Sequence, residues 1–182
     1  MPLRLKNDSF GDLGSILGPK AARTSASAIE QFRFHPSALI YLSPADYHCF
    51  HTPIEGTIKS VEALDMTSYS VTVKSDIFSK INCLSQNRRV VLLIEGEHDG
   101  ESYECAMVIV GGVTVDSIRI EDDIQSGKKV KKGQKVGAFA RGGSLVAVYF
   151  TKSIQLDESI RIAQKQHQVE NFYLNCGDGF GV

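Results

Sequence analysis

The fold is decided by a stretch near the middle of the chain, RVVLLIEGEHDG, at residues 89–100. Its first seven residues are a continuous apolar run between charged ends, which is typical of a buried β-strand, and the run stops at Gly96. The acidic turn at residues 97–100 then leads into a second strand-like segment from Tyr103 to Val110. The sequence therefore predicts a β-hairpin at this point.

Short segments of strand character recur on both sides of this hairpin. Turn residues separate them at fairly even spacing, which favours a barrel or sandwich over a βαβ sheet. Helical character is weaker, so we expect one mainly β domain over residues 1–182, a barrel-sandwich hybrid with a few short helices. The further predicted strands are 38–40, 57–61, 69–73, 113–120, 144–151 and a closing strand in 170–179, and the predicted helices are 25–32, 76–83 and 157–165.

Composition and charge narrow the classes of function. Twenty basic and 21 acidic residues leave a net charge of -1, which lacks the positive excess typical of nucleic-acid-binding proteins. No apolar run approaches the roughly 18–20 residues that cross a bilayer, and the first residues do not resemble a signal peptide. The cysteines are far apart in the sequence, which predicts a reduced, cytoplasmic setting and no metal site: Cys49, Cys83, Cys105 and Cys176.

The densest set of chemically active side chains is YLSPADYHCFHTPIEG, at residues 41–56. His48 and His51 are three residues apart and would share one face if the local backbone is helical. Asp46 could cap such a turn. Histidine is the natural proton-transfer group near neutral pH, so the pair is a candidate acid–base site. Packed or surface histidines are the alternative, and a metal site is the weakest of the three interpretations.

A second constellation lies in KKGQKVGAFARGGSLVAVYF, residues 131–150, where the pattern predicts turn, strand, kink and strand. The kink carries Gly142-Gly143-Ser144, a triplet that by itself is most often an ordinary turn. A functional role requires Ser144 to attack a group near its own backbone with the help of a base. The basic residues 128–132 are expected to form a solvated turn, with contact to anionic lipid headgroups as the alternative.

Together these segments resemble the phosphatidylserine decarboxylase family of pyruvoyl enzymes. The family's tyrosine–histidine segment is matched by residues 41–53, with Cys49 where a basic residue is common. Three motifs in the family's order over residues 3–150 are more specific than any one of them. The other matching segments are 82–90, 107–115, 132–139 and the triplet that ends at Ser144.

The resemblance implies that the chain cuts itself between Gly143 and Ser144. Ser144 would attack the carbonyl of Gly143, and acyl shift and elimination would leave a pyruvoyl group at residue 144. The products would be residues 1–143 and residues 144–182. The pyruvoyl ketone would form a Schiff base with the substrate amine and act as the electron sink when carbon dioxide leaves.

The resemblance also implies roles and a substrate. His51 looks like the base that activates Ser144, and His48 looks like the acid–base group of decarboxylation, with Asp46 as an orienter. The implied reaction converts phosphatidylserine to phosphatidylethanolamine and carbon dioxide. The implied protein is cytoplasmic or peripherally bound to a membrane, and it is a homodimer of cleaved protomers.

One part of the family's pattern is not matched. In the family, the aspartate of a Pro-x-Asp-Gly segment completes a triad with the histidine and the serine, and no such segment occurs in the 182 residues. Asp8, Asp12 or Asp46 could take its place, or an amino-terminal portion encoded elsewhere could supply it. Two further hypotheses stay open: a soluble decarboxylase of free aromatic amino acids on this scaffold, and a truncated homologue that never matures and has a binding role.

Overall fold

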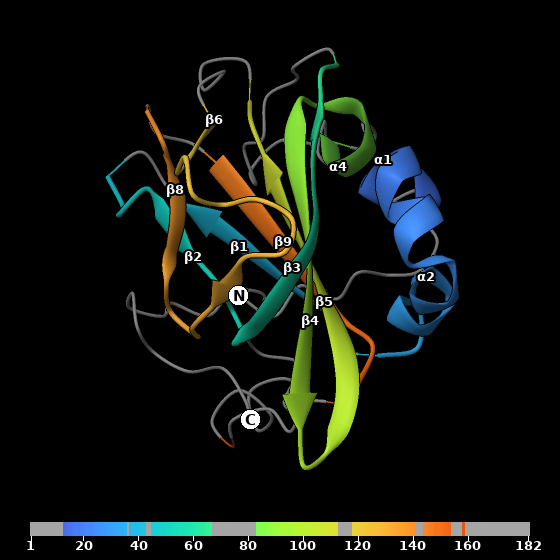
Figure 1. Cartoon of the computed structure of the whole chain (residues 1–182). Coiled ribbons are helices and arrows are strands. Elements are labelled where there is room, and N and C mark those ends of the chain that lie inside the picture. Colours follow the sequence, from blue (N-terminus) through green and yellow to red (C-terminus); the bar gives the residue numbers. More distant parts are fainter. Residues whose placement is uncertain are drawn as a thin grey trace.

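The computed structural model describes residues 13–35, 37–42, 45–66, 83–112, 118–140, 144–153 and 158. Helices within these residues are α1 (Leu13–Thr24), α2 (Ala26–Phe32) and α4 (Cys83–Gln86). The strands are β1 (Ser37–Leu42), β2 (Cys49–His51), β3 (Gly56–Leu64), β4 (Arg89–His98), β5 (Glu101–Val110), β6 (Ile118–Ile120), β7 (Lys129–Val130), β8 (Lys135–Phe139) and β9 (Ser144–Phe150). The prediction of a mainly β fold with a few short helices is confirmed (Figure 1).

Two antiparallel sheets pack face to face. The large sheet has six strands in the order β1-β9-β5-β4-β3-β7, and the small sheet has three in the order β2-β8-β6. Helices α1 and α2 cover one face of the large sheet, and the small sheet lies over the other (Figure 1). The arrangement is therefore a sandwich of open sheets with a helical layer on its outside.

The predicted hairpin is the middle of the large sheet. Strands β4 and β5 pair along their full length, from Arg89 opposite Val110 to His98 opposite Glu101. The turn residues have positive φ angles of 55° at Asp99 and 77° at Gly100. Asp-Gly is favoured at this kind of two-residue turn because both positions need a left-handed backbone. The hairpin prediction is thus confirmed.

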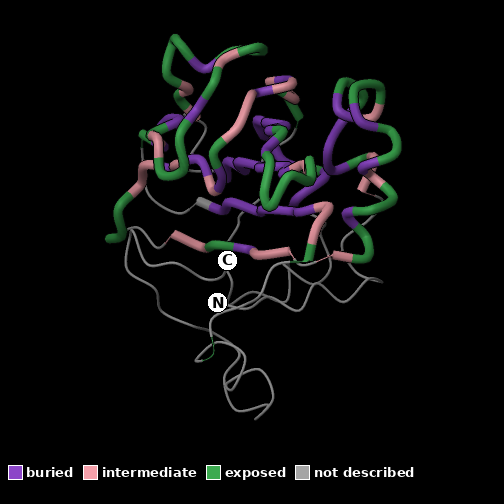
Figure 2. Tube along the Cα trace, turned by 60° about the horizontal axis from the view of Figure 1, so that its bottom comes forward, coloured by how far each residue is buried: buried purple, intermediate pink, exposed green. Residues whose placement is uncertain are grey.

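The continuous apolar run of β4 follows from burial on both of its faces. Val91 and Leu93 pack in the core between the large sheet and the helices. Leu92 and Ile94 pack in the second core, between the two sheets. Successive strand residues point to opposite faces, so a strand covered on both sides needs no polar alternation. Figure 2 shows the buried residues running through the middle of the molecule.

Helix α1 was not predicted from the sequence. Gly18 interrupts its backbone with a φ of 82°, and Pro19 follows directly, so the local pattern does not indicate a helix. Tertiary contacts stabilise it instead, because Ile16 and Leu17 are buried against the large sheet. A Cβ atom at Gly18 would lie 2.6 Å from the movable end of Leu64, and the φ of 82° is the stronger reason for glycine at this position.

The other local predictions divide into three groups. Strands were correctly predicted at 38–40, 57–61 and 144–151, which correspond to β1, β3 and β9, and the helix at 25–32 corresponds to α2. The predicted strand at 113–120 is described from 118 onward, as β6. Outside the described residues lie the strands predicted at 69–73 and 170–179, the helix at 76–83 except Cys83, and the helix at 157–165 except Glu158.

Candidate active site

The two histidines lie on and beside a strand. His51 is the last residue of β2, and His48 directly precedes that strand. Pairing with β8 holds the segment extended, since Cys49 lies opposite Ala138 and the Phe139 N–H donates to the His48 carbonyl at 2.9 Å. The segment is therefore extended rather than helical, so the condition under which the two histidines would share a helical face is not met.

Two backbone pairings bring the histidine segment and the serine to the same end of the sandwich. In the large sheet, Ser144 opens β9 and pairs with Leu42 at the end of β1. In the small sheet, His48 is bonded to Phe139 at the end of β8. The chain therefore leaves the large sheet at Leu42 and reaches the small sheet at His48, while a second connection runs back from Phe139 to Ser144. Gly143 lies outside the described residues.

Tyr47 contacts the ring of His51. The two rings are stacked, with centroids 5.7 Å apart and planes inclined by 13°. The hydroxyl of Tyr47 lies 3.5 Å from His51 Nε2, which is a long polar contact. Sequence reasoning named Asp46 as the orienter, a role that stays a prediction, and it missed Tyr47. The four-residue spacing between Tyr47 and His51 indicates a contact only in a helix, so the pattern did not reveal this one.

A cation lies on the strand next to His51. The register of β2 and β8 shifts at this point, so that His51 is opposite Lys135. Lys135 Nζ lies 2.7 Å from Glu121 Oε1, and the hydrogen bond to that carboxylate raises the pKa of Lys135. The irregularity is a bulge, a feature that often re-aims a side chain beside a functional site.

A close backbone approach fixes the small sheet. A Cβ atom at Gly137 would lie 2.1 Å from the carbonyl oxygen of Arg119 and 2.8 Å from the ring of Phe50. That ring packs edge-on against Phe139, with centroids 5.1 Å apart, and both are buried between the sheets. The strand that carries the histidines is therefore anchored to the core through Phe50.

Each of the two cores contains a buried free cysteine. Cys83 and Cys105 are buried, and desolvation raises the pKa of each thiol. A thiol with a raised pKa is a poor nucleophile at neutral pH. Within the described ranges, no three His, Cys, Asp or Glu side chains gather closely enough to hold a metal ion.

The described helices include none with the length and apolar character needed to span a membrane.

Comparison with known proteins relates this arrangement to one family. The family model for phosphatidylserine decarboxylase matches residues 5–172. The phosphatidylserine decarboxylase proenzyme of Fusobacterium nucleatum is 28% identical over 146 residues, covering 79% of this chain and 45% of that protein. The proenzyme of a Geobacillus species is 32% identical over 124 residues, or 67% of this chain and 44% of its own length. Phosphatidylserine decarboxylase proenzyme 2 of Oryza sativa is 33% identical over 142 residues, which cover 78% of this chain and 22% of that protein. The chain thus spans less than half the length of these relatives.

Proposed function

The chain belongs to the phosphatidylserine decarboxylase family, and from this premise we propose that it is a pyruvoyl-dependent decarboxylase that matures by cutting itself between Gly143 and Ser144. One observation carries the proposal. The pairings of Leu42 with Ser144 and of His48 with Phe139 bring the serine and the histidine segment to one end of the sandwich. The name proenzyme, borne by the relatives, is consistent with maturation by cleavage.

Maturation begins when Ser144 Oγ attacks the carbonyl carbon of Gly143. His51 accepts the hydroxyl proton, because serine oxygen is a weak nucleophile without a neighbouring base. The peptide bond is exchanged for an ester, and elimination at residue 144 then frees the carboxylate of Gly143. Water replaces the nitrogen of residue 144, which leaves as ammonia.

The position of β9 fits a cofactor that is made from residue 144. Strand β9 lies between β1 and β5 and pairs with both, so the new terminus stays in place after the chain is cut. The pyruvoyl group supplies the electron sink for loss of carbon dioxide from an amine substrate. His48 serves as the acid–base group that handles the proton of that step, and Tyr47 helps to orient the ring of His51.

The proposed reaction converts phosphatidylserine to phosphatidylethanolamine and carbon dioxide. Support comes from the relatives, each of which is named a phosphatidylserine decarboxylase proenzyme. From the same family membership we also propose that the cleaved protomers form a homodimer. We further propose that the protein contacts a membrane peripherally, because a lipid substrate resides there.

The intact mass of the denatured, purified protein tests maturation. We expect fragments of residues 1–143 and 144–182, the smaller with pyruvoyl in place of its first serine. The variant Ser144→Ala should remain one uncut chain. A single wild-type species at 19.9 kDa would refute self-cleavage by this chain.

Carbon dioxide release from the cleaved protein tests the substrate. Phosphatidylserine in detergent micelles should be decarboxylated, whereas free aromatic amino acids should not. Release from the amino acids alone would overturn the lipid substrate and leave the maturation chemistry intact.

A further inference from the structure

A basic turn joins β7 to β8. Its residues are Lys131, Lys132, Gly133 and Gln134, closed by a hydrogen bond from the Gln134 N–H to the Lys131 carbonyl at 3.0 Å. Gly133 has a φ of 78°, a conformation that glycine adopts without strain. Lys131 and Lys132 are exposed, as is Lys129 on β7. We call Lys129, Lys131 and Lys132 the lysine turn.

The ammonium groups of the lysine turn have no carboxylate partner among the described residues. The neighbouring lysines differ, because Lys128 lies 3.0 Å from Asp123 and Lys135 lies 2.7 Å from Glu121. Elsewhere, Lys59 is paired with Glu104 and Lys152 with Glu101. Among the described residues, three neighbouring lysines without a carboxylate partner thus gather in the lysine turn, where their charge is available to an anionic partner.

The lysine turn is fixed to the histidine strand. Thr52, which follows His51, is 2% exposed and exchanges hydrogen bonds with the turn. Its N–H donates to the Gln134 carbonyl, and its carbonyl accepts from the Gly133 N–H, both at 2.9 Å. Its hydroxyl donates to the Lys131 carbonyl. The backbone of the lysine turn is thereby joined to the residue that follows His51.

The other end of the histidine segment exposes an aromatic ring. Tyr47, next to His48, is 51% exposed. Tyrosine suits a membrane–water interface, because its ring is apolar and its hydroxyl is polar. The histidines therefore lie between a basic turn and an exposed tyrosine.

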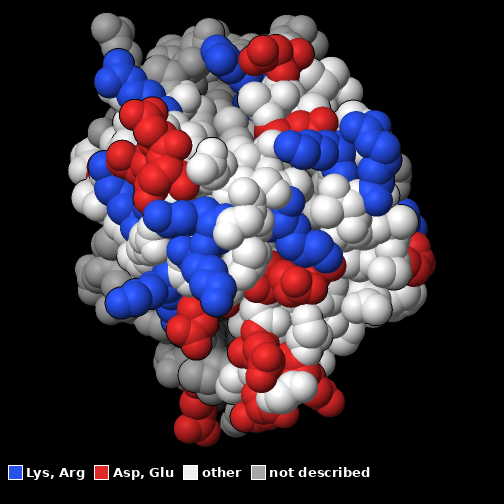
Figure 3. Space-filling model, in the orientation of Figure 1, with Lys and Arg blue, Asp and Glu red and all other residues white. Residues whose placement is uncertain are grey.

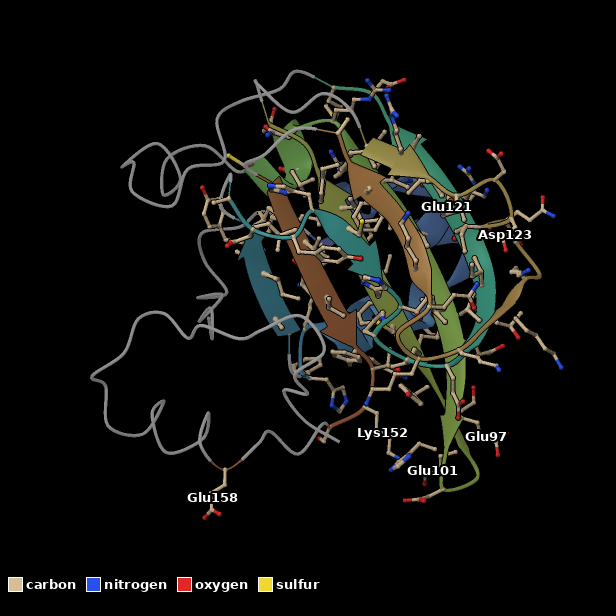
Figure 4. All side chains as sticks on the ribbon, turned by 90° about the vertical axis from the view of Figure 1, so that its left-hand side faces the viewer. Glu97, Glu101, Glu121, Asp123, Lys152 and Glu158 are labelled. Carbon is tan, nitrogen blue, oxygen red and sulfur yellow. The ribbon has the colours of Figure 1, made fainter. Side chains whose placement is uncertain are left out.

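Charge is distributed unevenly over the molecule. Residues 118–135 contain six basic and three acidic side chains, whereas residues 89–110 contain five acidic ones and a single buried arginine. Glu97 and Glu101 lie at the far end of the β4–β5 hairpin (Figure 4). In Figure 3 acidic side chains lie at this lower end and also at the upper left and top, and basic ones extend across the middle of the face. An anionic surface would attract the basic part and repel the hairpin end, which sets an orientation.

We propose that the lysine turn docks the protein on an anionic lipid surface, with the histidine segment beside the bilayer and the acidic hairpin end directed away. This inference rests on the proposed function, which requires a substrate held in a membrane. Each lysine near such a surface strengthens binding about fivefold, so the three together contribute about 100-fold.

Vesicle sedimentation tests docking without using the substrate. The probe is phosphatidylcholine vesicles with about one third phosphatidylglycerol, compared with pure phosphatidylcholine, at low and high salt. We expect binding to the anionic vesicles alone, weakened by salt because screening reduces surface attraction. The triple variant Lys129→Gln/Lys131→Gln/Lys132→Gln should bind about 100-fold more weakly.

The matched control removes three other charges: Arg23→Gln/Arg33→Gln/Lys152→Gln. It has the same net charge as the lysine-turn variant and should bind like the wild type to within about threefold, because its sites lie away from the turn. Equal binding by the wild type and the lysine-turn variant would overturn the proposal, as would equal weakening by both triple variants. Retention on an acidic polymer such as polyglutamate without vesicle binding would overturn it in favour of an acidic macromolecule.

Docking and decarboxylation can fail separately. A short-chain phosphatidylserine that stays monomeric reports on catalysis without a surface, and the lysine-turn variant should process it like the wild type. With phosphatidylserine in vesicles, the same variant should be slower in proportion to its lost binding. Anionic vesicle binding without any decarboxylation would refute the proposed function and leave docking intact, whereas activity on vesicles unaffected by the variant would refute docking.

Discussion

The two faces of the large sheet are covered by different partners. On one face, α1, α2 and α4 close a core around Leu17, Phe32 and Leu93. On the other, the small sheet closes a core around Phe50 and carries the histidine segment. Among the described residues, the helix side carries none of the candidate site, whereas the small-sheet side carries the proposed base and the proposed acid–base group, with the lysine turn beside them. One face therefore serves mainly stability, and the other serves the proposed chemistry.

A buried arginine fastens the helix side. Arg89 is 2% exposed, and its Nε donates to the Ile16 carbonyl at 2.8 Å. Its Nη1 donates to the carbonyls of Ser85 and Asn87, and its Nη2 donates to that of Ser15. Burial lowers the pKa of Arg89, and the charge of Glu62 opposes that shift. A single side chain thus ties α1 and α4 to β4.

The largest expected effect is on the reactions of the small-sheet side, with little change in the free energy of unfolding. His51→Ala should remain uncut, with self-cleavage slowed at least about 1,000-fold, because Ser144 loses its base. His48→Ala should be cut and then decarboxylate poorly. Time courses of cleavage by mass spectrometry, together with carbon dioxide release, measure both steps. Urea unfolding should change by less than about 1 kcal/mol in either variant.

The control for the histidine pair is His98→Ala, on the exposed hairpin end, which should mature and react normally. Exchanged phenotypes for the two site variants would exchange their roles. Normal cleavage and activity in both would remove the histidines from the mechanism.

The second effect should be confined to stability. Arg89→Ala leaves buried carbonyls of α1 and α4 without a donor, so the free energy of unfolding should fall by about 3–5 kcal/mol. Urea denaturation of the uncut Ser144→Ala protein measures this without interference from cleavage. The exposed Arg23→Ala should change stability by less than about 0.5 kcal/mol. A loss below about 1 kcal/mol for Arg89→Ala would show that the clamp is not needed.

A smaller effect should combine a loss of stability with slower self-cleavage. Gly137→Ala places a Cβ atom against the Arg119 carbonyl, and the required shift should cost about 1–3 kcal/mol and slow cleavage, because β8 holds the histidine strand. Gly100→Ala is the matched control, with open space but a φ of 77°, and should cost about 1 kcal/mol without slowing cleavage. Unchanged cleavage in Gly137→Ala would mean that the site tolerates movement of the small sheet.

The smallest expected effect concerns an ion pair on the large sheet. Lys59 Nζ lies 2.6 Å from Glu104 Oε1, and this hydrogen bond is the main cause that raises the pKa of Lys59. A raised folded-state pKa means that the stabilisation is present below pH 10.5, the ordinary value, and is lost as the pH rises through the folded value. Lys59→Met should therefore lower stability by about 1 kcal/mol at pH 7 and by less at pH 11. An equal loss at both pH values would assign the effect to packing.

Local signals account for what could be predicted of the fold. The Asp-Gly turn and the continuous apolar run specify the central hairpin, because turn geometry and burial act on neighbouring residues. Helix α1 escaped prediction because Gly18-Pro19 disrupts its local pattern, while its stability comes from contacts with distant strands. His48 and His51 were expected to share a face only if their segment were helical, and pairing with β8 makes that segment extended.

The sequence by itself determined the chemical groups: two histidines, a Gly-Ser junction, and motifs in the order of one family. Tertiary structure alone decided how the segments that carry them are brought to one end of the sandwich. Leu42 pairs with Ser144, and His48 with Phe139, although each pair is far apart along the chain. The attachment of the lysine turn to Thr52 arises in the same way. Backbone pairing between distant strands depends on the register of whole sheets, which no short segment of sequence specifies.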